Sequence, residues 1–244
     1  MRRCLAIGFA VVVTTTNLAA AQGAHLSRCC LAGQHRGLAA TAARQQVSAT
    51  FTSHRPDTHT GVTVTATYTH GDVPAPYALV HADDSLPAGT TINNKQLPRC
   101  TANIDQFELL GPSACPAASI VGSGYAVFDF GVPFGLSRLH VKITVINAPG
   151  QIWFLGQVDG ITQLERGGID GSAISINVPR LPGLGKEGAV IDHEQFTITA
   201  ASGLLTTPKT CTKAGWVFHR THTYVDGVTQ VAKVKIPCSR RVKS

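Results

Sequence analysis

Apolar and polar residues alternate along most of the chain, and this alternation predicts β-strands. In "RLHVKITVI", residues 138–146, the apolar residues Leu139, Val141, Ile143 and Val145 all fall on one face. A period of two residues is typical of a strand with one face buried. The same pattern recurs at residues 62–68, 172–178 and 194–200.

Two other segments refine this picture of strands. Residues 152–158, "IWFLGQV", are apolar on both faces and predict a central strand that is covered on both sides. Near the end of the chain, Asp226 and Gly227 separate two β-rich runs. Asp-Gly is a strong hairpin signal, because the tight turn needs positive φ.

One short helix is expected among these strands. In "TANIDQFELL", residues 101–110, Thr101 is the expected N-cap, and Ile104, Phe107 and Leu110 are expected to point inward.

Strands spaced by about 8–12 residues, with Gly and Pro between them, predict an all-β fold. We expect an antiparallel β-sandwich, immunoglobulin-like or jelly-roll-like, held by disulfides. The predicted sandwich domain covers residues 47–238, after a mobile stalk at 22–46 and before a basic tail at 239–244. Whether it is one sandwich or two is left open by the length of the chain.

The first residues have the pattern of a signal peptide. Arg2 and Arg3 precede the apolar run 5–13, and Ala19 to Ala21 offer a small-residue cleavage site. The apolar run is too short to cross a bilayer, which needs about 20 residues. We therefore predict a signal peptide at 1–21, and a mature protein that is secreted or associated with the cell envelope without a membrane span.

The charge pattern does not indicate a nucleic-acid partner. Removal of residues 1–21 lowers the net charge from +7 to about +5. The basic residues are scattered except in the tail "SRRVKS", whereas nucleic-acid binders gather Lys and Arg on one face.

Six of the seven cysteines remain after that removal, and in an oxidising compartment an even number indicates disulfides. Six cysteines allow about 15 pairings, among which short loops favour Cys100–Cys115 and Cys211–Cys238. Zinc is the alternative, but it prefers cysteines or histidines at tighter spacing. The adjacent Cys29 and Cys30 stay open, either free or paired to another chain.

Several motifs together resemble an uncharacterised family of secreted actinomycete proteins. They are "HRPDTHTGV", "LPAGTTINNKQLPRCTA", "GPSACPAASIVGSGYA", "LTTPKTCTKAGWVF" and "YVDG…IPC", which lie within residues 48–238. The resemblance implies export, an all-β fold, and the pairing of Cys100 with Cys115 and of Cys211 with Cys238. It implies no activity, and Cys29-Cys30 departs from the family pattern.

No motif for catalysis, for a metal or for a cofactor emerges from the sequence. A G-x-S-x-G elbow and a dinucleotide fingerprint are both missing. His219 and His222 are three apart in a predicted strand, so they are expected on opposite faces. We predict no catalytic residue, no cofactor and no metal ligand.

A pair of carboxylates gathered by the fold is the enzymatic alternative, because their separation is spatial and leaves no mark in the sequence. If two of them faced each other in one pocket, an extracellular hydrolase of carbohydrates or esters would be favoured. The candidates are Asp159, Glu165, Asp170, Asp192 and Glu194.

One alternating set in the last hairpin is a candidate ligand platform. It is either a core face or an aromatic and basic surface for a cell-wall glycan, an apolar ligand or another envelope protein. Its members are Trp216, Phe218, Arg220, His222 and Tyr224. The preferred function is therefore a secreted, non-catalytic protein with a binding or structural role.

Overall fold

A computed structural model of the chain describes residues 43–69, 78–129, 138–179 and 190–239. The predicted signal peptide, Cys29 and Cys30, and most of the predicted stalk and basic tail lie outside these residues. The first described strand begins at Gln45, two residues before the predicted start of the domain.

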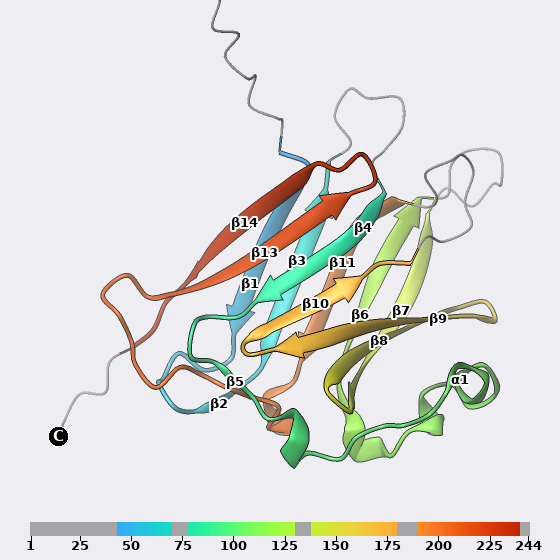
Figure 1. The fold of residues 1–244 in the computed structure, drawn as a ribbon, viewed down its shortest axis with the longest axis horizontal. Helices are drawn as coiled ribbons and strands as arrows, with labels where there is room; N and C mark the ends of the chain where they lie inside the picture. The colour runs from blue at the N-terminus through green and yellow to red at the C-terminus, as the bar shows by residue number, and fades with distance from the viewer. Residues whose placement is uncertain (1–42, 70–77, 130–137, 180–189, 240–244) are drawn as a thin grey trace, which may run out of the picture. The chain divides into compact units, whose positions relative to one another are not determined.

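Strands dominate the described residues, as predicted (Figure 1). In chain order they are β1 (Gln45–Phe51), β2 (His59–Thr60), β3 (Val62–Tyr68), β4 (Leu79–Ser85), β5 (Thr91–Ile92), β6 (Ile120–Asp129), β7 (Leu139–Ala148), β8 (Gln151–Val158), β9 (Ile161–Asp170), β10 (Ala173–Asn177), β11 (Val190–Ile198), β12 (Leu205–Thr206), β13 (Trp216–Tyr224) and β14 (Thr229–Ile236). The helical segments are α1 (Ile104–Leu110) and single 3-10 turns at Asn94–Gln96, Gly111–Ala114, Ala117–Ser119 and Ala200–Ser202.

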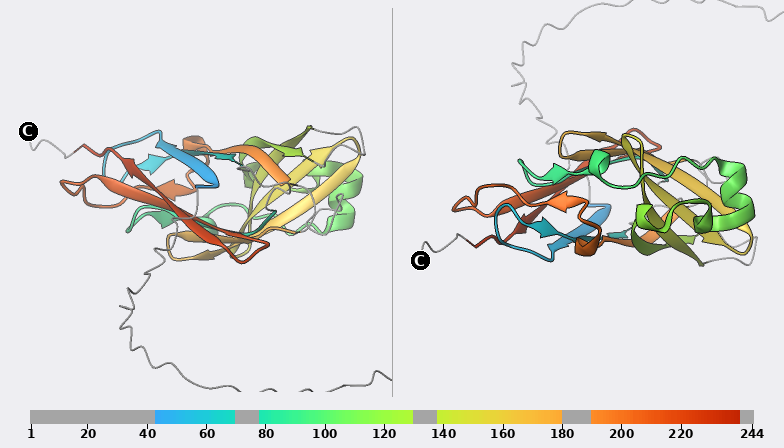
Figure 2. Two further views of the ribbon diagram at one scale, coloured as in Figure 1. Left: turned by 90° about the horizontal axis from the view of Figure 1, so that it is seen from above. Right: turned by 90° about the horizontal axis from the view of Figure 1, so that it is seen from below.

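Eleven of these strands form one antiparallel sheet, in the order β1-β3-β11-β6-β7-β8-β9-β10-β4-β13-β14. The sheet curls until its edge strands β1 and β14 lie side by side (Figure 2). At this seam the backbone N of Arg44 donates to Oε1 of Gln230 at 2.8 Å, and Nε2 of Gln45 donates to the carbonyl of Gln230 at 3.1 Å. The sheet is thus nearly closed into a barrel.

The prediction of an antiparallel, mostly β fold with disulfides is confirmed, but the fold is not clearly a sandwich. A sandwich has two separate sheets, whereas here hydrogen bonds connect all eleven strands in one series. A period of two specifies that one face of a strand is buried, and it does not distinguish a facing sheet from the far wall of a barrel. A second, small sheet in the order β2-β12-β5 lies at one end of the barrel (Figure 1).

The central strand predicted at 152–158 is confirmed as β8, which is covered on both faces. Ile152 and Phe154 belong to the core inside the barrel. Trp153 and Leu155 point the other way, into a second core that contains Phe107 of α1 and the Cys100–Cys115 disulfide. The segment around α1 therefore covers the outer face of this part of the sheet (Figures 1 and 2).

The predicted short helix exists, but its cap and its inward face differ from the expectation. Asn103, not Thr101, caps α1, and it forms a reciprocal capping box with Gln106. Only Phe107 is buried, while Ile104 and Leu110 are exposed. With seven residues the helix has fewer than two full turns, so it presents one position to the sheet.

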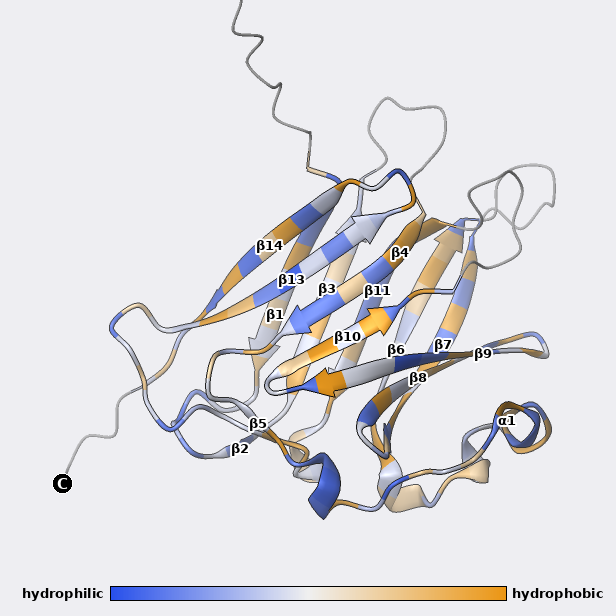
Figure 3. Cartoon of the chain, viewed as in Figure 1, coloured by the Kyte–Doolittle hydropathy of each residue, from blue (hydrophilic) through white to orange (hydrophobic). Residues whose placement is uncertain are grey.

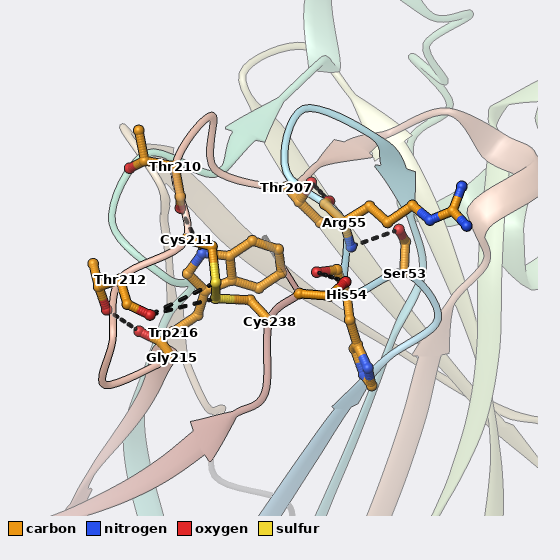
Figure 4. Close-up of a disulfide and its surroundings, with 11 residues drawn as sticks. Ser53, His54, Arg55, Thr207, Thr210, Cys211, Thr212, Gly215, Trp216 and Cys238 are labelled. Atoms are coloured by element: carbon orange, nitrogen blue, oxygen red, sulfur yellow. Dashed lines mark hydrogen bonds between the residues drawn. A yellow bond between two sulfur atoms is a disulfide. The ribbon is translucent and has the colours of Figure 1, made fainter. Parts of the chain in front are cut away.

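Both favoured disulfides are present. Cys100–Cys115 has a Cα–Cα distance of 5.1 Å and is buried in the second core. Cys211–Cys238, with a Cα–Cα distance of 5.8 Å, connects the segment before β13 to the end of β14. It lies against the ring of Trp216, whose Nε1 donates to the carbonyl of Thr210 at 2.8 Å (Figure 4).

Asp-Gly pairs make two of the hairpin turns. Asp159 and Gly160 have φ of 43° and 81° and form a two-residue turn between β8 and β9. The predicted β13–β14 hairpin is confirmed, although only Gly227 of its pair has positive φ, at 81°.

Candidate functional site

The five residues of the candidate platform all lie on the inner face of β13. None is more than 4% exposed, so they face the interior of the barrel and not the solvent. They are Trp216, Phe218, Arg220, His222 and Tyr224. His219 lies on the opposite face of β13 from His222, as expected. A ligand can touch the platform only from inside the barrel, and its role in binding stays a prediction.

Arg220 connects strands across the interior. Its Nη2 lies 2.6 Å from Oε1 of Glu194 on β11, and its Nε lies 3.4 Å from Oδ1 of Asp84 on the neighbouring strand β4. Because β11 and β13 are not neighbours in the sheet, the Arg220–Glu194 ion pair spans the barrel. Figure 3 shows hydrophilic positions on both β4 and β13.

Two aromatic side chains complete the surroundings of Arg220. The hydroxyl of Tyr68 on β3 donates a hydrogen bond to Oε1 of Glu194 at 2.5 Å. Nε2 of His222 accepts a hydrogen bond from Nε of Arg220 at 2.7 Å, so the neutral imidazole carries its proton on Nδ1. Burial, together with the nearby Arg220, lowers the pKa of His222 to about 2 and keeps the ring uncharged.

Positive charge is scarce among these interior groups. Burial raises the pKa of Asp84 to about 6, although Arg220 acts in the opposite direction. Burial, reinforced by the negative charge of Glu194, raises the pKa of Glu165 on β9 to about 7. Three carboxyl groups therefore share the single guanidinium of Arg220.

Next to this cluster the barrel contains a cavity of about 140 Å³. Ten of the thirteen described residues that line it are apolar or glycine, and the polar ones among them are Gln163, Glu165 and Glu194. A smaller void of about 30 Å³ is lined by Arg220 as well as by the same two glutamates. The larger cavity reaches the surface near Ile161, which is 60% exposed.

Of the five candidate carboxylates, the structure brings two to one cavity. Glu165 and Glu194 both line it. Asp159 lies in the β8–β9 turn, Asp170 ends β9, and Asp192 lies 3.4 Å from Arg138. Asp159 is thus explained by turn geometry, and the two glutamates become the candidate functional pair.

Sequence reasoning missed Asp84 and Tyr68. Both had a signal in the pattern, because each occupies an inward position of an alternating strand. Asp84 follows Ala82 and precedes Leu86 in the inward series of β4, where an apolar residue is the norm. A charged residue at such a position indicates a buried ionic partner.

No group of three or more His, Cys, Asp or Glu side chains in the described ranges is arranged to hold a metal ion. Within the same ranges, no helix has the length and apolar character needed to cross a bilayer. The two disulfides indicate folding in an oxidising environment, which is typical of extracellular proteins.

Fold and site together define a class of molecule: a nearly closed antiparallel barrel with an interior ionic cluster beside an apolar cavity. No protein-family model matches the chain, and no curated protein matches it in sequence. The resemblance to secreted actinomycete proteins stays a prediction.

Proposed function

We propose that this chain is a secreted, non-catalytic binding protein that holds a small apolar molecule inside its barrel. The observation that supports this function is the cavity of about 140 Å³, with its apolar wall and two carboxyl groups. Apolar cavities with a few polar groups in fixed places are the usual form of small-molecule sites.

The size of the cavity limits the ligand. An apolar cavity of about 150 Å³ accommodates a benzene molecule in another protein. We therefore expect a single aromatic ring or a short branched chain. A cell-wall glycan does not suit this cavity, because the hydroxyls of a sugar would lose their hydrogen bonds to water against an apolar wall.

Glu165 and Glu194 share one cavity, as a hydrolase requires, but binding is preferred because Glu194 is already held by other side chains. Among the described residues that line the cavity there is no Ser, Thr, Cys or His, so these residues offer no nucleophile of these types for a covalent acyl intermediate. Glu194 is engaged by Arg220 and Tyr68 through Oε1. The signal-peptide pattern and the disulfides support export to the envelope or beyond.

Binding of benzyl alcohol to the mature protein tests the proposal. We expect saturable binding by titration calorimetry, and Ala126→Leu, which fills part of the cavity, should weaken it at least about tenfold. Ala173→Leu is the matched control, because Ala173 lies on the face of β10 opposite the buried Ile174. Equal binding of benzyl alcohol by all three proteins would refute the proposal.

One observation favours a second candidate, an extracellular hydrolase. A carboxyl group with a pKa of about 7, on Glu165, lines the same cavity as a charged carboxylate, and such pairs serve as acid and base in glycosidases. Small aryl glycosides and aryl esters are the probes. Turnover by the parent that Glu165→Gln abolishes would establish the hydrolase and overturn the non-catalytic proposal.

A further inference from the structure

The interior of the barrel has fewer positive than negative groups where the cavity meets the ionic cluster. Glu194 and Asp84 already share Arg220, whose two ion pairs are 2.6 Å and 3.4 Å long. No hydrogen-bond donor among the described residues satisfies either carboxylate oxygen of Asp84. Glu165 adds a third acid, so at neutral pH the cluster lacks at least one positive charge.

Glu165 is the group that a ligand would meet. It lines the cavity, it is partly buried, and it makes no hydrogen bond or ion pair with any described residue. Its neighbours across the strand pairs are apolar: Phe154 on β8 lies opposite it, and Ile176 of β10 packs beside the adjacent Gly167. The charged groups that act on it are Glu194 of β11 and Arg220 of β13.

We propose that the ligand carries a protonated amine, which pairs with the carboxyl groups of Glu165 and Glu194 while its apolar body fills the cavity. This inference rests on the proposed binding function. An ammonium group supplies both the missing positive charge and the hydrogen-bond donors that Glu165 lacks, and charged hydrogen bonds of this kind are the strong ones.

An anionic ligand is the opposite possibility, since Nη1 of Arg220 has no hydrogen-bond partner within the described residues. However, Arg220 lines only the void of about 30 Å³ and not the larger cavity. A carboxylate in the larger cavity would meet the two glutamates first, and like charges repel.

Three probes with the same ring separate these possibilities: benzylamine, benzyl alcohol and benzoate, titrated into the mature protein at pH 7 and constant ionic strength. We expect benzylamine to bind at least about tenfold more tightly than benzyl alcohol, and benzoate to bind most weakly. If the alcohol binds and the amine binds no better, the amine inference is wrong and the proposed function stands. If none of the three binds, the proposed function itself fails.

Glu165→Gln keeps the shape of the side chain and removes its charge. We expect the ratio of amine to alcohol affinity to fall at least about tenfold in this variant. Glu108→Gln is the control, because Glu108 is exposed on α1 and remote from the cavity wall. An unchanged ratio in Glu165→Gln would overturn the assignment of the amine to this carboxyl group.

The dependence on pH is an independent measurement. Glu165 must ionise to pair with the amine, so amine binding at pH 6 releases a proton, whereas binding at pH 8 does not. The affinity for benzylamine is therefore expected to rise up to about tenfold from pH 6 to pH 8, while that for benzyl alcohol does not rise. A parallel response of the two ligands would contradict the inference.

Discussion

The two halves of the barrel interior are filled in different ways. Around β3, β4, β11 and β13 the space is occupied by ion pairs and aromatic rings that contact one another across the barrel. Around β6 to β9 the inward residues are mostly apolar, and they leave a cavity. Glu165 and Glu194 lie where the two halves meet.

The difference shows what each half can do. The polar half has fixed partners at fixed distances, so its role is to hold the walls of the barrel together. The hollow half has unused volume and only a few polar groups, so it can accept a molecule. In the proposed site, the polar half supplies the charged end and the hollow half holds the body of the ligand.

Loss of Arg220 should lower the stability of the protein most, by acting on the polar half. Arg220→Met leaves Asp84 and Glu194 buried without a counter-charge, and we expect it to lower the free energy of unfolding by about 3–5 kcal/mol. Urea denaturation of the mature protein measures this. Arg138→Met is the control, because the side chain of Arg138 is 71% exposed and its pair with Asp192 should contribute less than about 1 kcal/mol. Similar losses in both variants would show that the polar half does not stabilise the barrel.

Removal of the buried disulfide should weaken the hollow half selectively. The Cys100–Cys115 loop spans 15 residues, and its opening in Cys100→Ala/Cys115→Ala should cost about 3 kcal/mol. We expect faster hydrogen exchange in β7 to β9, whose outer face the loop covers, than in β3 and β11. In Cys211→Ala/Cys238→Ala the faster exchange should instead appear at the ends of β13 and β14. Uniform changes in both variants would contradict this division.

Glu165 should make the stability of the junction depend on pH. Its pKa is raised to about 7 in the folded protein from an ordinary value near 4.5, so the folded state binds the proton more tightly than the unfolded state. The stabilising contribution is complete below the ordinary pKa and is lost as the pH rises through about 7.

His222 acts in the opposite direction, because its lowered pKa of about 2 favours folding as the pH rises toward 6.5. The measurement is therefore the difference in unfolding free energy between Glu165→Gln and the parent. We expect this difference to grow in favour of the variant from pH 4 to pH 8. A difference that does not vary with pH would show that Glu165 is not protonated inside the barrel.

The seam of the barrel should give the smallest effect. Arg44 pairs with Asp226 through two contacts of 3.0 Å and 2.8 Å, but Asp226 is 31% exposed. Asp226→Asn should cost less than about 1 kcal/mol in urea denaturation and leave benzyl alcohol binding unchanged. A larger loss would show that seam closure, rather than the interior cluster, determines stability.

Much of the fold could be predicted because alternation and turn chemistry are local. The inward series of β7, both faces of β8 and the Asp226-Gly227 turn can each be identified from neighbouring residues. The near closure of one sheet could not, because it depends on β4 pairing with the distant β10 and β13 and on β1 lying beside β14. The predicted helix cap was wrong by two residues: Thr101 and Asn103 are both good N-caps, but only Asn103 has a Gln three residues later to complete a capping box.

The candidate site was predictable only in part. The alternating set on β13 included Arg220 and His222, but nothing in that segment shows that their partners are Asp84 and Glu194. Such partners meet only when four strands curve round a common interior. Glu165 was named among five acids, and only the geometry separates it from Asp159.

The strand order also constrains when the barrel can form during synthesis. β4 has no hydrogen-bonded neighbour until β10 and β13 exist, and β3 needs β11 for its second edge. A chain that emerges from its N-terminus therefore presents an unpaired edge of β3 until β11 arrives, and an unpaired edge of β4 until β13 arrives. Sheets with such distant pairings fold slowly, and their unpaired strand edges are prone to aggregation until folding is complete. This protein should therefore depend on chaperones during folding more than a barrel of sequential hairpins would.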